Sequence, residues 1–245
     1  METVETLGRH DGPRGEVVLR RRSGCGPAID ELIINGAFAM DSSETFTERT
    51  LGELAVAATV TTARPRMLVG GLGLGYTVSE ILAAADRAGS EASVDVVEIE
   101  PCLIDWARSG LTPTLAAVAA DPRVRLHTGD VRAVLIGSPD QEDGDAETRP
   151  GAGPTGPWDA IVLDVDNGPD FLIHGDNRAL YTGSGLQAAY GQLTSGGTLA
   201  IWCQGRWAPL LGELRRLAPT ARERLFEVTR GERRFAYAIY SVSRT

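Results

Sequence analysis

The sequence predicts an α/β fold built on a mostly parallel β-sheet, and three observations lead to this prediction. From residue 66 onward, short apolar runs alternate with helical stretches, a pattern typical of βαβ units around a sheet buried on both faces. A glycine-rich turn over residues 70–75 follows the first apolar run and opens a helix. Two strand-like runs, 224–230 and 233–242, end the chain. Because only two residues join them, they are expected to form a hairpin with one antiparallel strand.

The N-terminal part predicts a smaller β-element. The runs GEVVLRR (15–21) and ELIINGAFAM (31–40) have the composition of strands, and the turn-prone SGCGPA separates them. The next segment, SSETFTERTLGELAVAATV, has a serine available as an N-cap and apolar residues at helical spacing. We therefore expect residues 1–60 to form a β-hairpin with a linking helix, and residues 61–245 to form one larger domain.

The larger domain follows in regular order. Its further strands are expected at 67–72, 94–100, 124–130, 159–166 and 198–204, and its helices at 77–87, 101–110, 184–193 and 208–217. The stretch 137–157 is rich in Gly, Pro and acidic residues and has almost no apolar ones. Because it cannot contribute to a core, it is expected to be a flexible surface loop.

Composition narrows the function classes. The 245 residues include 24 basic and 33 acidic side chains, a formal net charge of -9, which disfavours a protein that covers nucleic-acid phosphates. No apolar run is long enough to span a membrane, and the N-terminus has no apolar secretion signal, so we expect a soluble, cytoplasmic protein. The three cysteines and three histidines are scattered without ligand spacing, and we therefore expect no metal site.

The most informative segment is MLVGGLGLGYTVSEIL (67–82), where a buried strand runs into Gly71, Gly73 and Gly75 before a helix begins. Such a turn lets a ligand approach the backbone. Glu98, at the end of the next strand, is placed to accept hydrogen bonds from two ribose hydroxyls. The alternative is an ordinary turn followed by a solvated glutamate. The spacing GxGxG differs from GxGxxG, which favours a nucleoside without a diphosphate over a dinucleotide.

A third candidate, Asp130, ends the strand at 124–130. Ligands of open α/β sheets bind at the carboxyl ends of the strands, so this carboxylate could accept a hydrogen bond from an exocyclic amine such as that of adenine. It could equally be the N-cap of a helix over 131–136. The two roles are compatible.

Five segments, in order, resemble the spermidine-synthase-like branch of the Rossmann-fold S-adenosylmethionine-dependent methyltransferase superfamily. They are ELIINGAFAMDSSETFTERTLGELA, LVGGLGLGYT, VVEIEP, DPRVRLHTGDVRAVL and WDAIVLDVDNGPDF. The resemblance implies a Rossmann-like class I methyltransferase fold, with a seven-stranded, mostly parallel sheet whose last strand is antiparallel, and a small N-terminal β-hairpin element beside the active site. It also implies S-adenosylmethionine as the cofactor. The cofactor-binding residues would be Gly71, Gly73, Leu74, Gly75, Glu98, Asp130 and Asp164.

The chemistry is expected over residues 163–181, where a strand ends in the candidate catalytic residues Asp164, Asp166 and Asn167. Carboxylates beside a sulfonium can hold an attacking amine and accept its proton. The alternative is that Asp164 only ends the strand and the other acids face water. Because adjacent strand residues point to opposite faces, the role of Asp166 depends on how the chain leaves the strand.

Several positions depart from the aminopropyltransferase pattern of that branch. Leu74 replaces the aspartate that contacts the decarboxylated donor, and Asn167 stands at the position of the catalytic aspartate. An amide cannot act as a carboxylate base. Met40 stands where a glutamine is usual, and Phe46-Thr47-Glu48 replaces a Tyr-His-Glu. These departures disfavour polyamine synthesis.

The leading hypothesis is therefore an S-adenosylmethionine-dependent methyltransferase acting on a small amine or amino-acid-like acceptor. The alternatives are an aminopropyltransferase that uses decarboxylated S-adenosylmethionine, and a catalytically silent nucleoside-binding scaffold. A nicotinamide dehydrogenase is disfavoured by the glycine spacing. The expected partner is a small molecule, with no nucleic acid or membrane involved, and the exposed N-terminal β-element would suit a homodimer.

Overall fold

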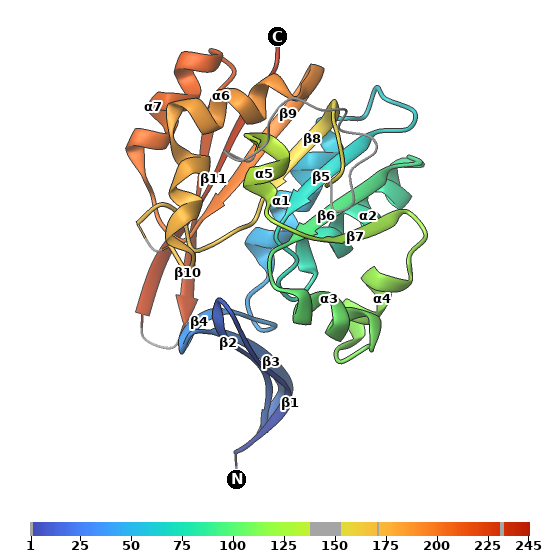
Figure 1. The fold of residues 1–245 in the computed structure, drawn as a ribbon, viewed down its shortest axis with the longest axis vertical. Helices are drawn as coiled ribbons and strands as arrows, with labels where there is room; N and C mark the ends of the chain where they lie inside the picture. Colours follow the sequence, from blue (N-terminus) through green and yellow to red (C-terminus); the bar gives the residue numbers. More distant parts are fainter. Residues whose placement is uncertain (1, 138–152, 171, 231–232) are drawn as a thin grey trace.

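Two β-sheets organise the chain in the computed structural model, which describes residues 2–137, 153–170, 172–230 and 233–245 (Figure 1). The larger sheet has seven strands in the order β10-β11-β9-β8-β5-β6-β7, and the smaller has four strands in the order β1-β2-β3-β4. The small sheet lies at one end of the molecule, and the C-terminus lies at the other.

The N-terminal sheet is larger than the expected hairpin. Its antiparallel strands are β1 (Thr3–Gly12), β2 (Gly15–Gly24), β3 (Gly26–Ile34) and β4 (Ala37–Asp41). The run ELIINGAFAM contains the end of β3, a turn and β4, because Asn35 and Gly36 both have positive φ and reverse the chain. The prediction lacks β1, since this mostly exposed edge strand buries no apolar face that would give an alternating pattern.

The seven-stranded sheet confirms the predicted α/β fold. Its strands are β5 (Arg66–Gly70), β6 (Ser93–Glu98), β7 (Val124–Thr128), β8 (Trp158–Leu163), β9 (Leu193–Cys203), β10 (Arg222–Arg230) and β11 (Arg233–Ser243). Strands β5 to β9 pair in parallel, and β11 pairs antiparallel with both β9 and β10. The last strand is therefore the antiparallel one, as predicted.

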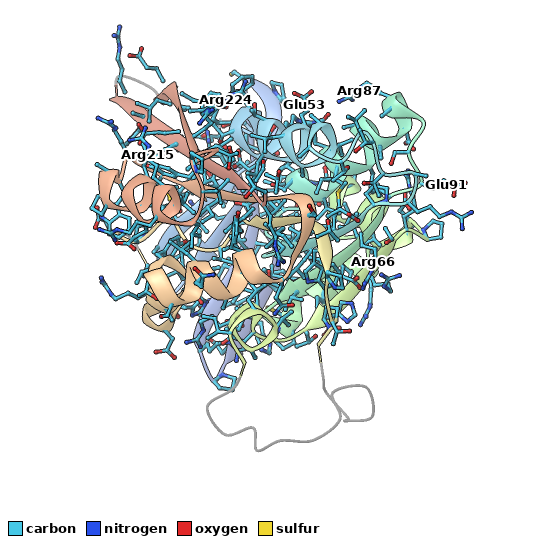
Figure 2. The ribbon with its side chains drawn as sticks, turned by 90° about the horizontal axis from the view of Figure 1, so that it is seen from above. Glu53, Arg66, Arg87, Glu91, Arg215 and Arg224 are labelled. Atoms are coloured by element: carbon cyan, nitrogen blue, oxygen red, sulfur yellow. The ribbon has the colours of Figure 1, made fainter. Side chains whose placement is uncertain are left out.

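Helices cover both faces of this sheet. One layer consists of α1 (Phe46–Ala57), α2 (Tyr76–Ala88), α3 (Pro101–Arg108) and α4 (Pro113–Ala120). The other consists of α5 (Val131–Leu135), the 3₁₀ helix η2 (Gly175–Tyr181), α6 (Gly183–Gly191) and α7 (Ala208–Leu217). Figure 2 shows the helical layers on either side of the sheet, with charged side chains such as Arg87 and Glu91 at the periphery.

Each face of the sheet has its own apolar core. In β5, Met67 and Val69 pack with the α1–α4 layer, and Leu68 packs with the opposite layer, as the period of two requires. Leu19 and Leu32 of the N-terminal sheet belong to the first of these cores. The small sheet is thus packed against the larger unit and covers its end.

Two parts of the chain differ from or lie beyond the prediction. Helix α4 and helix η2 were not predicted, and the loop expected at 137–157 falls mostly on residues outside the described part of the structure. Within the described residues, no helix is long and apolar enough to cross a membrane.

Candidate active site

A cavity lies where the carboxyl ends of β5, β6, β7 and β8 face the N-terminal sheet. Its lining comes from these strand ends, from β3, β4 and β9, from the helices α1, α3 and α5, and from the segment after β8. The charged and amide side chains in the lining are those of Glu48, Glu98, Glu100, Asp130, Asp164, Asp166, Asn167, His174 and Asn177. Ligands of open α/β folds bind at this edge of the sheet, so the cavity is the candidate active site.

The glycine turn after β5 forms one wall of the cavity. Gly71, Gly73 and Gly75 have φ of 90°, 51° and 85°, in the left-handed region that favours glycine. A Cβ atom on Gly71 would lie 2.2 Å from the carbonyl oxygen of Asp164, and one on Gly73 would lie 2.6 Å from Sδ of Met40. The turn is therefore packed tightly between β8 and the N-terminal sheet.

Glu98 occupies the expected position at the end of β6. Its side chain is almost fully enclosed, with 5% of the residue exposed. Oε2 accepts a hydrogen bond from the Leu72 amide at 2.7 Å, and Oε1 accepts one from the Glu100 amide at 2.8 Å. Burial raises the pKa of the Glu98 carboxyl above its usual range, although these backbone hydrogen bonds oppose the shift. The carboxylate is thus fixed in the cavity wall with lone pairs left for a ligand.

Asp164 follows β8 directly and faces the glycine turn. Its amide donates to the Gly70 carbonyl at 2.9 Å, and its Oδ2 accepts from the Thr77 hydroxyl at 2.6 Å. Burial raises the pKa of this carboxyl above its usual range, and the Thr77 hydrogen bond offsets part of the shift. Asp164 therefore lies between the turn and the segment after β8.

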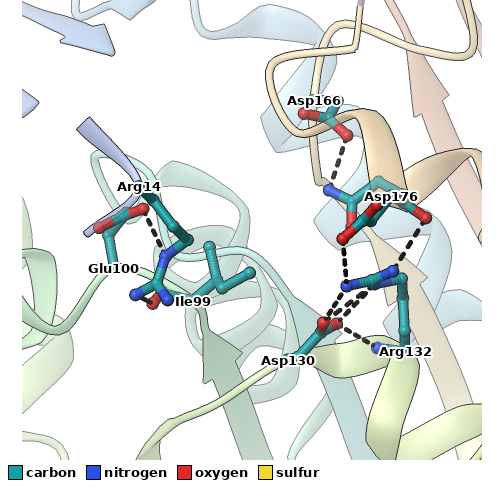
Figure 3. Close-up of polar contacts among 8 residues, drawn as sticks. Arg14, Ile99, Glu100, Asp130, Arg132, Asp166 and Asp176 are labelled. Atoms are coloured by element: carbon teal, nitrogen blue, oxygen red, sulfur yellow. Dashed lines mark hydrogen bonds and ion pairs between the residues drawn. The ribbon is translucent and has the colours of Figure 1, made fainter. Parts of the chain in front are cut away.

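Asp130 has the N-cap role expected from its sequence position, and it also lines the cavity. It lines the cavity, and its Oδ1 accepts from the Arg132 amide at 2.8 Å as the N-cap of α5. The Arg132 guanidinium also pairs with Asp130 at 2.6 Å and reaches the Asp176 carbonyl at 3.1 Å (Figure 3). This pair ties the start of α5 to η2 and keeps the Asp130 carboxylate at the cavity edge.

Asp166 organises the segment that follows β8. Its φ of 55° turns the chain away from the strand, so that Asp164, Asp166 and Asn167 all line the cavity. Oδ1 of Asp166 accepts from the amides of Ile173 and His174 at 2.8 and 3.0 Å, and Oδ2 accepts from Nδ2 of Asn177 at 2.7 Å. Both oxygens thus already accept hydrogen bonds that hold residues 173–177 in place.

Leu74 and Gly75 lie behind the cavity wall. Leu74 is 1% exposed, and its amide is 3.3 Å from Sδ of Met40. Gly75 is the N-cap residue of α2 and packs near Leu115 and Val118. Neither residue is part of the cavity lining. Their contribution is to shape the turn, and the contact surface itself comes from Gly71 and Gly73.

The predicted site residues did not include three titratable residues of the lining. Glu48, from α1, is buried and accepts from the Thr47 hydroxyl at 2.8 Å, and Thr47 in turn accepts from Nε1 of Trp202 at 3.0 Å. Glu100 and His174 face each other, with 3.8 Å between Oε1 and Nε2. Glu100 was accessible to sequence reasoning, because it follows Glu98 by two residues. His174 lies within the 163–181 segment where the chemistry was expected but was not singled out there, and the turn at Asp166 brings it to the cavity.

The electrostatic character of the cavity follows from this set. Six carboxylate residues line it, those of Glu48, Glu98, Glu100, Asp130, Asp164 and Asp166, and no arginine does so among the described residues. The chain has no lysine. A cavity lined by one sign of charge raises the local concentration of ligands of the opposite sign. Among the described residues, no group of three or more His, Cys, Asp or Glu side chains has the arrangement of a metal site.

Comparison with known proteins supports the fold. No family model matches the chain, and no curated protein sequence matches it either. Human methyltransferase-like protein 13, solved in complex with SAH (S-adenosylhomocysteine), is 19% identical with a TM-score of 0.53, over 81% of this chain and 82% of that chain. The O-methyltransferase TomG from Streptomyces achromogenes, solved with SAM (S-adenosylmethionine), is 15% identical with a TM-score of 0.47. The match covers 83% of this chain and 82% of that chain. The first likeness assigns the chain a Rossmann-like methyltransferase fold.

Proposed function

We propose that this chain is a SAM-dependent transferase, most simply a methyltransferase that acts on a small amine or amino-acid-like acceptor. The observation that carries the proposal is the fixed carboxylate of Glu98 beside the bare turn at Gly71 and Gly73. The likeness to a methyltransferase that was solved with SAH supports the same donor. The five ordered sequence segments favour the spermidine-synthase-like branch of that superfamily.

The donor half of the cavity, which we define as Gly71, Gly73, Glu98 and Asp130, fits a nucleoside. The two glycines line it with backbone alone, so a ligand can come close to the chain. Glu98 would accept the ribose hydroxyls, since an ionised carboxylate has about four lone-pair sites and backbone amides use two of them. Asp130 would accept a hydrogen bond from the adenine amine.

The acceptor half, defined as Met40, Glu48, Asp166, Asn167 and His174, favours a cation. Glu48 is buried and Asp166 is half-buried, and charge interactions are stronger in such surroundings than in water. An amine arrives in its ammonium form at neutral pH and would be attracted by this charge. An acceptor with a free carboxylate would have to be oriented with that group toward solvent. We therefore propose a small amine as the partner.

Bound SAM would supply an electrophilic methyl group on a sulfonium. The acceptor nitrogen must lose a proton before its lone pair forms the new N–C bond and the C–S bond breaks. The raised pKa of Asp164 suits this carboxylate to accept that proton. Asp166 would position the acceptor through the 173–177 segment, and Asn167 would orient the nitrogen through its amide oxygen. Positioning of this kind supplies a large share of the rate in such a displacement.

The nucleoside that co-purifies with the protein tests this proposal. Mass spectrometry of the heat-released ligands should detect SAM or SAH from the wild-type chain. A Glu98→Gln variant, which keeps the shape of the side chain, should retain much less. The proposal is overturned if the wild-type chain carries neither nucleoside and does not acquire either one on incubation.

An aminopropyltransferase is the second candidate, and the absence of arginine in the described cavity lining favours it. Decarboxylated SAM has no carboxylate to place against an acidic wall, whereas SAM does. Three residues disfavour this candidate because they depart from the aminopropyltransferase pattern: Leu74, Met40 and Asn167. Tighter binding of methylthioadenosine, the product of aminopropyl transfer, than of SAH would decide for this candidate.

A catalytically silent nucleoside-binding scaffold is the third candidate. The Asp166 contacts support this candidate in one respect. A carboxylate that accepts hydrogen bonds from three donors serves the structure of the segment and is poorly placed to act as a base. Donor binding without consumption of SAM across a panel of primary amines would favour this reading. Formation of SAH with any amine of the panel would exclude it.

A further inference from the structure

The turn between β1 and β2 places an arginine of the N-terminal sheet against residues 99 and 100, which follow Glu98 of the donor half. Nε of Arg14 donates to Oε1 of Glu100 at 2.9 Å, and its terminal Nη2 donates to the Ile99 carbonyl (Figure 3). The two partners directly follow Glu98 in the chain. Arg14 and Glu100 are 86 residues apart in sequence, so this contact joins the two sheets of the molecule.

Glu100 needs a cationic partner at this position. Its side chain is 3% exposed, and it lies beside the buried carboxylate of Glu98. Two neighbouring buried carboxylates repel each other, and removal of the counter-charge from a buried ion leaves an unfavourable unpaired charge. The Arg14 guanidinium, with 36% of its side chain exposed, supplies the counter-charge from the solvent side.

The amide of Glu100 connects this pair to the donor half. That amide donates to Oε1 of Glu98, the carboxylate proposed to bind the ribose. Arg14 donates to both the side chain of Glu100 and the carbonyl of Ile99. It therefore restrains the backbone that positions the Glu100 amide for its hydrogen bond to Glu98. A planar guanidinium can make two such contacts at once in a fixed geometry.

Arg14 itself is held by a second turn of the same sheet. Nδ2 of Asn35 donates to the Arg14 carbonyl at 2.9 Å, and Oδ1 of Asn35 accepts from the Glu16 amide at 3.0 Å. The Asn35 amide also donates to the Glu16 carbonyl at 2.8 Å. The arginine thus extends from a braced turn, which gives the preset geometry that a binding site needs from its supporting residues.

We infer that Arg14 is a positioning residue for donor binding, acting through Glu100 and Ile99 on the ribose-binding carboxylate of Glu98. The inference rests on the proposed function for the identity of the donor. It makes the N-terminal sheet a structural part of the donor half, in addition to the wall that β3 and β4 give to the acceptor half. Nε2 of His174, from the segment after β8, lies 3.8 Å from the same Glu100 oxygen that Arg14 contacts.

Calorimetric titration with SAH tests the inference without any acceptor. Arg14→Gln should weaken SAH binding about tenfold, because a charge-assisted hydrogen bond to a buried group is lost. Arg14→Lys should recover part of the affinity, since it keeps the charge but not the double contact. The matched control is Arg21→Gln, which removes the Arg21–Asp30 pair of the same sheet, 2.7 Å long and outside the cavity lining. It should leave the affinity for SAH unchanged.

A double-mutant cycle separates positioning from general damage to the fold. If Arg14 acts through both contacts, Arg14→Gln should weaken SAH binding less in a Glu100→Gln background than in the wild type, because only the Ile99 contact is then lost. Equal losses in both backgrounds would overturn the role of Glu100, and equal binding by Arg14→Gln, Arg14→Lys and wild type would overturn the inference as a whole. Failure of the wild-type chain to bind SAH would instead contradict the proposed function. If Arg14→Gln does not fold, the SAH affinity of Arg14→Lys is compared with that of the wild type in the same two backgrounds.

Discussion

The two halves of the cavity are built in different ways. The donor half comes from short contiguous segments, in which a glycine turn or an acidic residue lies at or just after the end of a strand of the parallel sheet. The acceptor half is assembled from β4, α1 and the segment after β8, which are distant in sequence and meet only in the folded chain. Local patterns in the sequence point to single residues of both halves, but the way β4, α1 and the segment after β8 meet depends on the tertiary fold.

The largest expected effect is on the donor half. Glu98→Ala should weaken SAH binding by about 100-fold or more, because a buried acceptor is lost and the Leu72 and Glu100 amides are left without their partner. Calorimetry measures this loss. Glu53→Ala, at an exposed glutamate on α1, is the control and should bind SAH like the wild type. If Glu98→Ala bound SAH as tightly as the wild type, Glu98 would not be the residue that binds the ribose.

The glycine turn gives the next effect, on stability. Gly71→Ala should lower the free energy of unfolding by about 2–4 kcal/mol, because it combines a strained φ of 90° with a Cβ 2.2 Å from the Asp164 carbonyl. Gly196→Ala has a similar φ of 82° but no atom within 4 Å of the new Cβ, so it should cost only about 1–2 kcal/mol. Chemical denaturation measures both. Equal costs would mean that the close approach to β8 is unimportant.

Asp166→Asn tests the acceptor half and should separate turnover from donor binding. The amide cannot accept from all three donors, so the 173–177 segment should loosen and the rate of SAH formation should fall by about tenfold or more. SAH affinity should change by less than about threefold, since Asp166 lies outside the donor half. Asp176→Asn, at a largely exposed side chain, is the matched control. An equal loss of donor binding and turnover would show that the two halves are not separable.

The smallest effect is a pH dependence of donor binding. Burial raises the pKa of Glu98, and the ribose hydroxyls would donate to its ionised form. SAH affinity should therefore be constant at high pH and fall as the pH drops through this raised pKa, by at most tenfold per pH unit. The decline should begin at a higher pH than for an ordinary glutamate. Glu98→Gln should remove it, and an unchanged decline in that variant would assign the titration to another group.

The sequence predicted the parallel sheet, its antiparallel last strand and the positions of Gly71, Gly73 and Glu98, because each depends on a local pattern of apolar runs and turn residues. It did not predict β1, whose polar surface leaves no periodicity. The contact between Arg14 and Glu100 was also beyond prediction, since it depends on how the two sheets pack.

In the segment after β8, the sequence predicted a candidate residue but not its contacts. Asp166 was singled out as a candidate catalytic carboxylate, and its type and place at the strand end justified that choice. Its three hydrogen bonds depend on the left-handed turn at Asp166 itself, which non-glycine residues seldom adopt. Leu74 and Gly75 illustrate the converse case, because a motif includes residues that face away from the cavity as well as those that line it.

The most direct test of a SAM-type donor site is a calorimetric comparison of SAH and methylthioadenosine on the wild-type chain. We predict that both bind with one site per chain and that SAH binds more tightly. Tighter binding of methylthioadenosine would contradict methyl transfer as the assigned reaction and favour aminopropyl transfer. Binding of neither nucleoside at millimolar concentration would contradict the assignment of Gly71, Glu98 and Asp130 to a donor site.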